Sequence, residues 1–252
     1  MSNPYSTAAV ILAAGHGKRM QSEIPKVMMQ LNGRPLIDHV VSSVEQAKIF
    51  GAPVVVVSKK HAHVQEYLKD RARYAVQEEQ LGTGHAVRTA EGLLTRASHV
   101  VVLYGDMPLL QSESLIRLVE EHEEQKNTLT LMTAIVPEYA GMYAPLSSFG
   151  RIIRNERGEI MKSVEVKDAT QEEIREQEVN PCYCCFRADW LWRNLKTLRN
   201  TNAQKEYYLP DLIRVAIQDG EKVSSVPIDP KEAIGINTTE DLISAAQTIS
   251  ST

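Results

Sequence analysis

Residues 8–26 read AAVILAAGHGKRMQSEIPK, and the organisation expected for the rest of the chain follows from this segment. Its first part, Ala8 to Leu12, has the length and composition of a buried strand. The strand runs into Gly15 and Gly17, where backbone N–H groups can approach a ligand because glycine has no Cβ. A strand followed by a glycine-containing, cationic loop is a common way to hold phosphate groups. An ordinary turn with solvated lysines is the alternative.

Two common phosphate-binding signatures do not fit this loop. The ATPase P-loop requires Ser or Thr after its Gly-Lys pair, and here Arg19 follows Lys18. The dinucleotide-binding fingerprint requires a third glycine at the position of Met20. Lys18, Arg19 and Lys26 nevertheless supply positive charge against the single negative charge of Glu23. The segment therefore predicts a phosphate-binding loop of another kind.

Composition and charge exclude several classes of partner. The chain has 252 residues, of which 43% are hydrophobic and 24% charged, as in soluble globular proteins. Its net charge of −4 disfavours a nucleic-acid or anionic-membrane partner. No apolar run approaches the roughly 18 residues that span a bilayer, and the N-terminus has no signal-peptide pattern. We therefore expect a cytoplasmic protein whose cationic loop binds a small phosphorylated molecule.

Three cysteines, Cys182, Cys184 and Cys185, lie within four residues of one another. Neighbours this close cannot form a disulfide framework, and no His or Cys lies at zinc-ligand spacing. We expect small core residues in a strand of a reduced protein. Strand alternation would place Cys182 and Cys184 on the same, core-directed face.

Strands and helices alternate along the first half of the chain. Apolar periodicity predicts helices at residues 35–49, 64–68, 83–94 and 113–122, and strands at 53–57, 74–76, 100–104 and 129–135. This order predicts right-handed crossovers and a mostly parallel sheet with helices on both faces. Ligands of such sheets bind beyond the carboxyl ends of the strands, where the Gly15 loop falls.

The alternation loosens after about residue 135. The next segments predict a hairpin whose first strand covers residues 150–154, whose turn contains Gly158 and whose second strand begins at residue 160. A charged loop is expected at 167–177, strands at 181–186 and 223–227, and a helix at 208–219. Thr238 and Asp241 have the spacing of a capping box at the start of the last helix. We expect one α/β domain whose second half forms a lobe over the first.

Residues 77–86, QEEQLGTGHA, directly follow the third expected strand. The Gln77 amide can donate and accept together, which suits the imide edge of uracil. Gly82 would let backbone groups approach the base closely. A glycine-containing loop with Thr83 as a helix N-cap is the alternative, and both roles could coexist.

Residues 104–109, YGDMPL, end the fourth expected strand. Asp106 therefore lies at the carboxyl end of a central parallel strand, where a metal–phosphate ligand would bind. Mg²⁺ typically takes one or two protein carboxylates and completes its octahedron with phosphate oxygens and water. A turn-forming aspartate is the alternative.

Together these segments resemble the sugar-1-phosphate nucleotidyltransferases, in particular the uridyltransferase domains of bacterial bifunctional N-acetylglucosamine-1-phosphate uridyltransferases. Residues 12–20 with Pro25-Lys26 resemble the signature of that family. Further matches extend the resemblance to the final helix: Phe149-Gly150-Arg151-Ile152, Glu165 with Lys167-Asp168-Ala169-Thr170, Asn202 to Leu209, and Gly235-Ile236-Asn237.

The resemblance implies a fold and a set of site residues. The fold is a three-layer, Rossmann-like α/β arrangement with a mostly parallel mixed sheet and a smaller antiparallel sugar-binding lobe. Residues 1–252 would form a single nucleotidyltransferase domain, with a nucleotide-binding half to about 135, a sugar-binding half at about 136–236, and a C-terminal helix at 237–252. The implied roles are triphosphate binding by Leu12, Ala13, Ala14, Gly15, Gly17, Arg19 and Lys26, uracil binding by Gln77, Gly82 and Thr83, Mg²⁺ binding by Asp106 and Asn237, sugar binding by Tyr104, Gly150, Glu165 and Asn180, and catalysis by Arg19, Lys26 and Asp106.

The implied reaction forms UDP-N-acetylglucosamine and pyrophosphate from UTP and N-acetylglucosamine-1-phosphate. A sugar-phosphate oxygen would attack the α-phosphorus in line with Mg²⁺ assistance, so that positioning and electrostatics do most of the catalysis. The alternatives are another sugar-1-phosphate such as glucose-1-phosphate, another nucleotide, or a catalytically silent regulatory or binding relative. The intact set of Lys26, Asp106 and Asn237 argues against silence.

The chain departs from the family pattern in two ways. It has no hexapeptide repeats, so we expect no acetyl transfer and a monomer or small homo-oligomer rather than the family's β-helix trimer. It also reads Asn180-Pro181-Cys182 where the family has Asn-Thr-Gly. Because Cys182 is expected to face the core, we expect N-acetylglucosamine-1-phosphate to be the better substrate.

Overall fold

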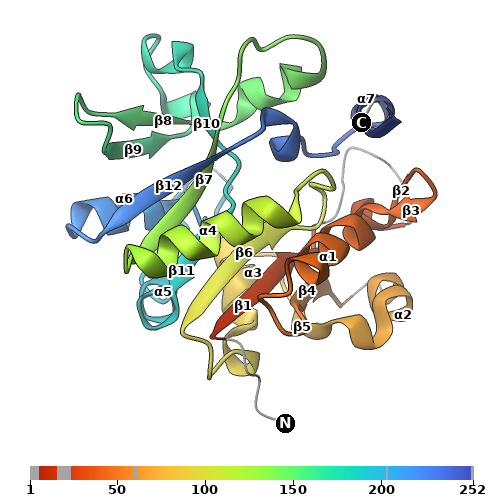
Figure 1. The fold of residues 1–252 in the computed structure, drawn as a ribbon. Helices are drawn as coiled ribbons and strands as arrows, with labels where there is room; N and C mark the ends of the chain where they lie inside the picture. The colour runs from red at the N-terminus through yellow and green to blue at the C-terminus, as the bar shows by residue number, and fades with distance from the viewer. Residues whose placement is uncertain (1–5, 16–23, 60–61, 203, 251–252) are drawn as a thin grey trace.

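Ten strands form one mixed sheet (Figure 1), in the order β5-β4-β1-β6-β11-β7-β10-β8-β9 with β12 on β7. The structure is a computed structural model that describes residues 6–15, 24–59, 62–202 and 204–250. The strands are Thr7–Leu12 (β1), Val54–Ser58 (β4), Arg73–Gln77 (β5), His99–Tyr104 (β6), Leu129–Ile135 (β7), Gly150–Arg154 (β8), Ile160–Val164 (β9), Glu178–Asn180 (β10), Cys184–Arg187 (β11) and Val223–Ile228 (β12). Gln30–Leu31 (β2) and Arg34–Pro35 (β3) form a separate two-stranded sheet.

Helices cover both faces of the sheet. The α-helices are Leu36–Ala47 (α1), His63–Leu68 (α2), Thr83–Thr89 (α3), Ser112–Glu124 (α4), Ala188–Leu195 (α5), Asp211–Gln218 (α6) and Thr239–Ser250 (α7). Short 3₁₀ helices are Lys26–Met28 (η1), Lys69–Arg71 (η2), Glu91–Leu93 (η3), Gly141–Ser148 (η4), Val166–Asp168 (η5), Glu173–Arg175 (η6) and Pro230–Ala233 (η7). None of the helices in the described ranges combines the length and apolar character needed to cross a membrane.

The apolar core lies in two layers, one on each side of the sheet. Ile11 of β1 packs in a cluster with the buried side chains of α1, α2 and α4. Its neighbour Val10 packs on the opposite face with those of α3, α5 and α6. Every residue of β1 is buried, which explains why its sequence is continuously apolar rather than alternating. The expected three-layer α/β class is confirmed.

The parallel strands end together at one edge of the sheet. β5, β4, β1, β6, β7 and β12 run in the same direction. Leu12 of β1 lies opposite Tyr104 of β6 and Val56 of β4. The segments that follow β1, β5 and β6 therefore emerge at the same edge of the sheet.

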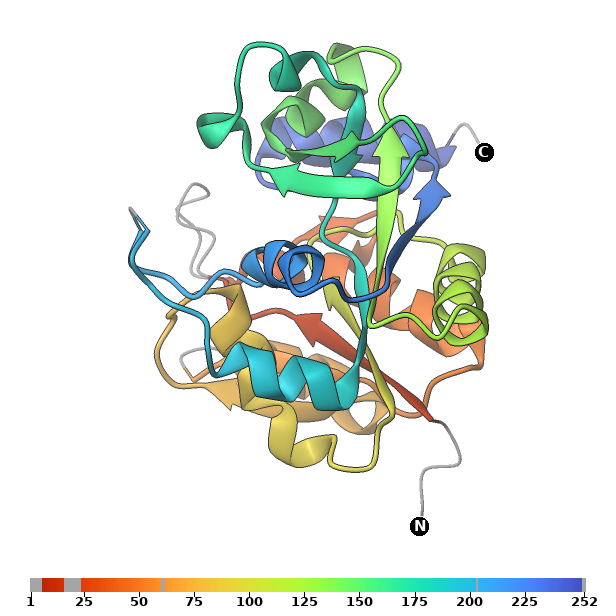
Figure 2. The ribbon, with the colours of Figure 1, turned by 90° about the vertical axis from the view of Figure 1, so that its left-hand side faces the viewer.

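The antiparallel part of the sheet contains β8, β9 and β10, at one end of the molecule (Figure 2). The second half of the chain also enters the central sheet, because β11 lies between β6 and β7 and β12 pairs with β7. A division of the chain at about residue 135 is thus not a division of the sheet.

The strand expected over residues 181–186 is confirmed only from Cys184 onward, as β11. A separate short strand, β10, ends at Asn180, and β10 and β11 pair with successive parts of β7. Val179 lies opposite Ala134 and Cys184 opposite Leu131, so residues 180–183 span a stretch where β7 has only residues 132 and 133. This bulge gives Cys182 a φ of 62°, a left-handed conformation that removes it from strand alternation. Cys184 and Cys185, in contrast, are buried as expected.

Two expected helices are shorter in the structure. The helix expected over residues 83–94 ends at Thr89 and is followed by η3, which contains the poor helix former Gly92. Leu93 consequently lies 40% exposed instead of joining the apolar stripe. The helix expected from residue 208 begins at Asp211, directly after Pro210.

Candidate active site

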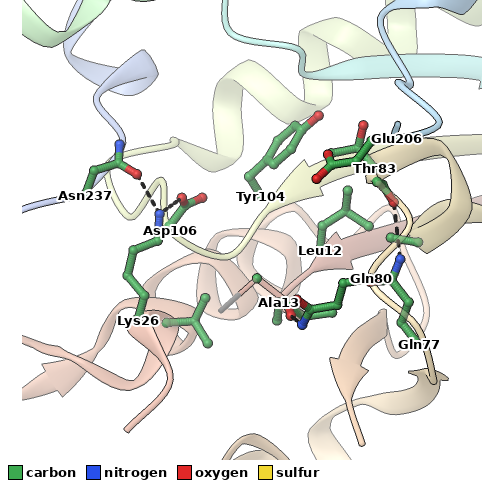
Figure 3. A pocket seen from close by; sticks show the side chains of 15 residues that line it. Leu12, Ala13, Lys26, Gln77, Gln80, Thr83, Tyr104, Asp106, Glu206 and Asn237 are labelled. Atoms are coloured by element: carbon green, nitrogen blue, oxygen red, sulfur yellow. Dashed lines mark hydrogen bonds and ion pairs between the residues drawn. The ribbon is translucent and has the colours of Figure 1, made fainter. Parts of the chain in front are cut away.

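A cavity of about 610 Å³ opens beyond the carboxyl ends of β1, β5 and β6 (Figure 3), a size typical of small-molecule sites. It is lined by Leu12, Ala13, Ala14, Gly15, Lys26, Val27, Gln77, Gln80, Gly82, Thr83, Ala86, Tyr104, Asp106, Glu206 and Asn237. The structure thus brings together the described residues expected to bind the nucleotide and the metal. Gly17 and Arg19 lie outside the described residues.

One end of the cavity combines a cation with two oxygen donors. The Lys26 ammonium forms an ion pair with the Asp106 carboxylate, and it donates to Asn237 Oδ1 over 2.7 Å. The Lys26 and Asp106 side chains are 14% and 23% exposed, so both groups are accessible from the cavity but mostly enclosed by protein. Three segments far apart in the sequence therefore meet at one point.

The local backbone explains how Asp106 and Lys26 are held. Gly105 donates its N–H to Leu12 O over 2.9 Å, and a Cβ on Gly105 would come within 2.8 Å of Ile37 Cδ1. A side chain at this position would require Ile37 to move, so a glycine suits the point where β6 turns towards the cavity. Pro25 is extended (φ −54°, ψ 140°), and the 3₁₀ turn η1 begins directly afterwards at Lys26.

Asn237 is fixed by the cap of the last helix. The backbone N–H groups of Asn237 and Thr238 both donate to the Asp241 carboxylate over 2.8 Å. Asp241 N–H donates in turn to Thr238 Oγ1 over 3.1 Å. The expected capping box is confirmed. The residue before Asn237, Ile236, donates its N–H to the Asp106 carbonyl over 2.8 Å, which links this segment to the end of β6.

The chemistry of this end suits Mg²⁺. Asp106 and Asn237 already direct a carboxylate and an amide oxygen at the positive charge of Lys26. Hard oxygen atoms are the ligands that Mg²⁺ prefers, and one or two from the protein are sufficient when phosphates and water supply the others. No group of three or more His, Cys, Asp or Glu residues able to hold a metal ion occurs in the described part of the chain. The donor set thus fits a metal shared with a phosphorylated ligand.

Gln77 lies at the other end of the cavity, and its side chain is already engaged within the protein. It is 3% exposed. Its Nε2 lies 3.2 Å from Gly82 O and 3.0 Å from His85 Nδ1. The expectation that this amide both donates to and accepts from a base is therefore corrected, because both N–H groups have internal partners. The oxygen Oε1 remains as an acceptor.

Gly82 is required by a close approach of the chain to itself. Its φ is +107°, and a Cβ there would lie 2.6 Å from Tyr207 O and 2.9 Å from Glu206 Cβ. The N-cap of α3 is Gly82 rather than Thr83. Thr83 Oγ1 instead accepts the N–H of Leu209 over 2.9 Å.

Sequence reasoning missed two polar residues of the cavity. Gln80 donates to the Ala14 carbonyl, which links the loop after β5 to the loop after β1. Glu206 reaches the cavity because the backbone of the next residue, Tyr207, is bonded to the loop after β5 and the start of α3. The Tyr207 N–H donates to Leu81 O over 2.7 Å, and the Tyr207 carbonyl accepts the Gly84 N–H over 2.8 Å. Both residues lie in segments that carry the family resemblance, which was the available signal, but their positions depend on tertiary contacts.

The residues expected to bind the sugar cluster beside Tyr104. Asn180 lies opposite Gly150 in the register of β10 and β8, and its Nδ2 donates to Ser163 Oγ over 3.1 Å. A Cβ on Gly150 would lie 3.5 Å from Glu165 Oε1. Burial raises the pKa of both Glu165 and Tyr104, and the charge of Glu165 makes a smaller contribution to the raised pKa of Tyr104. Of these residues, only Tyr104 lines the cavity itself.

Cys182 belongs to this cluster rather than to the core, which corrects the expectation from strand alternation. It is partly exposed, and its N–H donates to Asn180 Oδ1 over 2.8 Å. The pKa of its thiol is raised to about 12, mainly by burial and also by the charge of Glu165, while a hydrogen bond with Tyr104 acts in the opposite direction. Interactions with both side chains show that the thiol lies beside the expected sugar-binding residues.

Comparisons with known proteins agree with this geometry. Residues 9–207 match the family model of the MobA-like NTP transferase domain. The chain is 42% identical over 245 residues to a bifunctional protein GlmU of Acetivibrio thermocellus, covering 96% of this chain and 51% of the relative. It is 41% identical over 249 residues to one of Halalkalibacterium halodurans, covering 98% and 52%. The chain thus spans about half the length of the curated relatives it matches.

Two solved structures share the fold. A UDP-glucose pyrophosphorylase complexed with UDP-glucose superposes with a TM-score of 0.73 at 17% identity, covering 97% of this chain and 98% of that one. A putative glucose-1-phosphate thymidylyltransferase from Bacillus anthracis gives 0.75 at 18% identity, covering 96% and 94%. At these identities the likeness concerns the fold alone.

Proposed function

This chain belongs to the family of MobA-like NTP transferase domains, and from that premise we propose that it is a sugar-1-phosphate uridylyltransferase. The observation that carries the proposal is the cavity itself. Lys26, Asp106 and Asn237 converge at one end, and Gln77 lies at the other. A nucleoside triphosphate has the same polarity, with its phosphates at one end and its base at the other.

The proposed reaction needs no protein nucleophile. An oxygen of the sugar phosphate attacks the α-phosphorus of UTP, one P–O bond forms, and the P–O bond to pyrophosphate breaks. Two anions must meet and negative charge builds on the leaving group, so that positioning and electrostatic stabilisation supply the catalysis. The Lys26 ammonium neutralises phosphate charge at this end of the cavity. When bound, Mg²⁺ held by Asp106 and Asn237 would supply further charge neutralisation.

The acceptor that we propose is N-acetylglucosamine-1-phosphate. This choice is supported by the motifs that the chain shares with the N-acetylglucosamine-1-phosphate uridyltransferases and by the clustering of Gly150, Glu165 and Asn180. Asn180 and Glu165 provide hydrogen-bonding groups for sugar hydroxyls. The product would be UDP-N-acetylglucosamine, with pyrophosphate as the second product.

Glucose-1-phosphate is a second candidate because of one observation. The Cys182 thiol interacts with Glu165 and Tyr104, whereas the family motif has glycine at this position. A thiol there reduces the space available for an N-acetyl group and favours an unsubstituted hexose. The N-acetyl sugar was expected from the sequence because Cys182 was expected to face the core, and the position of this side chain removes that reason.

The proposal is tested by pyrophosphate release from a matrix of UTP, CTP, ATP and GTP against both sugar phosphates, with Mg²⁺ present. We expect turnover with UTP, and addition of a chelator should abolish it. A folded protein that releases no pyrophosphate with any pair would show that the proposal is wrong. Turnover with glucose-1-phosphate but not with the N-acetyl sugar would select the second candidate.

A further inference from the structure

We propose that His85 is a positioning residue that holds the Gln77 amide with its oxygen free for the base, and so selects a pyrimidine with an N–H at position 3, as in uracil, over cytosine. This inference rests on the proposed function, because it concerns the base that the same cavity would accept. It adds a second residue to base selection, one that need not touch the nucleotide.

The orientation of the Gln77 amide follows from its two partners. The Gly82 carbonyl is only an acceptor, so the atom 3.2 Å from it must be the amide nitrogen. The same nitrogen lies 3.0 Å from His85 Nδ1 and directs its second N–H there. His85 Nδ1 must then be an unprotonated acceptor. With both N–H groups engaged and Gln77 3% exposed, the amide is fixed.

The surroundings of His85 keep its imidazole neutral. Burial lowers its pKa below 6.5, and the positive charge of Arg88 on α3 lowers it further. A hydrogen bond with the backbone of Glu79 and the charge of that residue act in the opposite direction. Tyr207 is the other titratable group among the residues that line the small pocket beside His85. The net effect leaves Nδ1 free to accept at neutral pH.

Protonation of His85 would disrupt this arrangement. An imidazolium has N–H groups at both nitrogens, so Nδ1–H would face the amide N–H of Gln77. Rotating the amide by half a turn would satisfy His85, but it would place Oε1 against the Gly82 carbonyl. Acid pH should therefore release the amide from its single orientation.

The fixed amide distinguishes the two pyrimidines by their hydrogen-bonding edges. Uracil presents N3–H as a donor, which Gln77 Oε1 can accept. Cytosine presents N3 as an acceptor, so two acceptors would face each other without a proton. An unpaired buried polar group of this kind corresponds to a preference for uracil of about tenfold or more.

The test measures equilibrium binding of UTP and CTP in the absence of sugar phosphate, and kcat/KM for both nucleotides in its presence. In the wild-type protein at about pH 8, UTP should be preferred, and the preference should fall several-fold as the pH is lowered below 6.5 into the range where the imidazole protonates. His85→Leu should show a low UTP/CTP ratio that does not vary with pH. His85→Gln, whose side-chain carbonyl can accept the same bond, should retain the preference and lose its pH dependence.

His39→Leu is the matched control, because His39 is a partly buried histidine of α1 that bonds Leu31 O instead. It should keep both the wild-type ratio and its pH dependence. The inference is wrong if His85→Leu weakens UTP and CTP equally, which would mean a purely structural role. A wild-type protein that prefers UTP in binding but releases no pyrophosphate would overturn the proposed function and leave this inference standing.

Discussion

Replacing Gly82 by alanine should destabilise the protein and distort the candidate site together. The added Cβ would lie 2.6 Å from Tyr207 O and 2.8 Å from Tyr207 N, both backbone atoms that cannot rotate away. The backbone at Gly82 also has φ +107° and ψ 176°, a region that is essentially confined to glycine. The segment carrying Glu206 and Tyr207 must therefore move, and the Gly82 carbonyl that holds Gln77 must move with it.

The expected loss of stability is the sum of two terms. A residue with a Cβ in this backbone region costs about 1–3 kcal/mol, and forcing an extra carbon into close-packed surroundings costs about 1–3 kcal/mol more. The lower entropy of the unfolded alanine chain returns about 0.4–1 kcal/mol. A net loss of about 1–6 kcal/mol is expected, which is a large share of the roughly 5–15 kcal/mol that stabilises a typical domain.

Gly92→Ala provides the matched control in a urea-unfolding experiment. A Cβ at Gly92 would have no atom within 4 Å, and its φ is not in the left-handed region. Its free energy of unfolding should change by no more than about 0.5 kcal/mol or rise slightly. Gly82→Ala should also lower kcat/KM for UTP, whereas Gly92→Ala should not. Equal stabilities of the two variants would refute the close approach of the segment around Tyr207 to Gly82.

Four further substitutions test other parts of the molecule. Lys26→Ala and Asp106→Ala should each reduce turnover by about 10²-fold or more. Their melting temperatures should change little, since both side chains lie at the cavity wall. Near-normal turnover of Asp106→Ala would contradict a metal-ligand role. Cys182→Gly should shift kcat/KM towards N-acetylglucosamine-1-phosphate, and an unchanged sugar preference would mean that the thiol does not limit the sugar site. The free energy of unfolding of this variant should rise by up to about 1 kcal/mol, because the relief of left-handed strain exceeds the entropy cost of glycine. Burial lowers the pKa of His122 from 6.5 to about 3, so the wild-type protein should lose stability as pH falls from about 6.5. His122→Leu should show a shallower decline in urea titrations above about pH 4.5, and parallel curves would argue against a buried neutral imidazole.

The parts of the fold that were predictable are those coded by short segments. β1 and β4 are buried on both faces, so a continuous apolar run identifies them without knowledge of their neighbours. Once the strands are parallel, their carboxyl ends must meet at one edge, which places Lys26, Gln77 and Asp106 in one region. The cap at Thr238 was also local, since its partner Asp241 is only three residues away.

The parts that were not predictable depend on register and on close packing. The bulge at Cys182 exists because β10 and β11 pair with different parts of β7, and no local pattern reports that mismatch. The internal partners of Gln77 could not be inferred from its amide alone, because the same side chain could equally have faced a base. Glu206 reaches the cavity only through backbone bonds between residues more than a hundred positions apart.

The cavity is closed at both ends by segments from the second half of the chain. At the cationic end, Asn237 bonds Lys26, and the neighbouring Ile236 N–H bonds the Asp106 carbonyl. At the end near Gln77, the Tyr207 backbone bonds Leu81 and Gly84, and thereby brings Glu206 to the cavity. The strand ends of the first half supply Lys26, Asp106 and Gln77, but their surroundings are completed only when the later segments pack against them. Because β11 is also inserted between β6 and β7, the two halves of the chain share one sheet, and both contribute residues to the cavity. The geometry that would select a base and a sugar is therefore a property of the whole domain and not of either half.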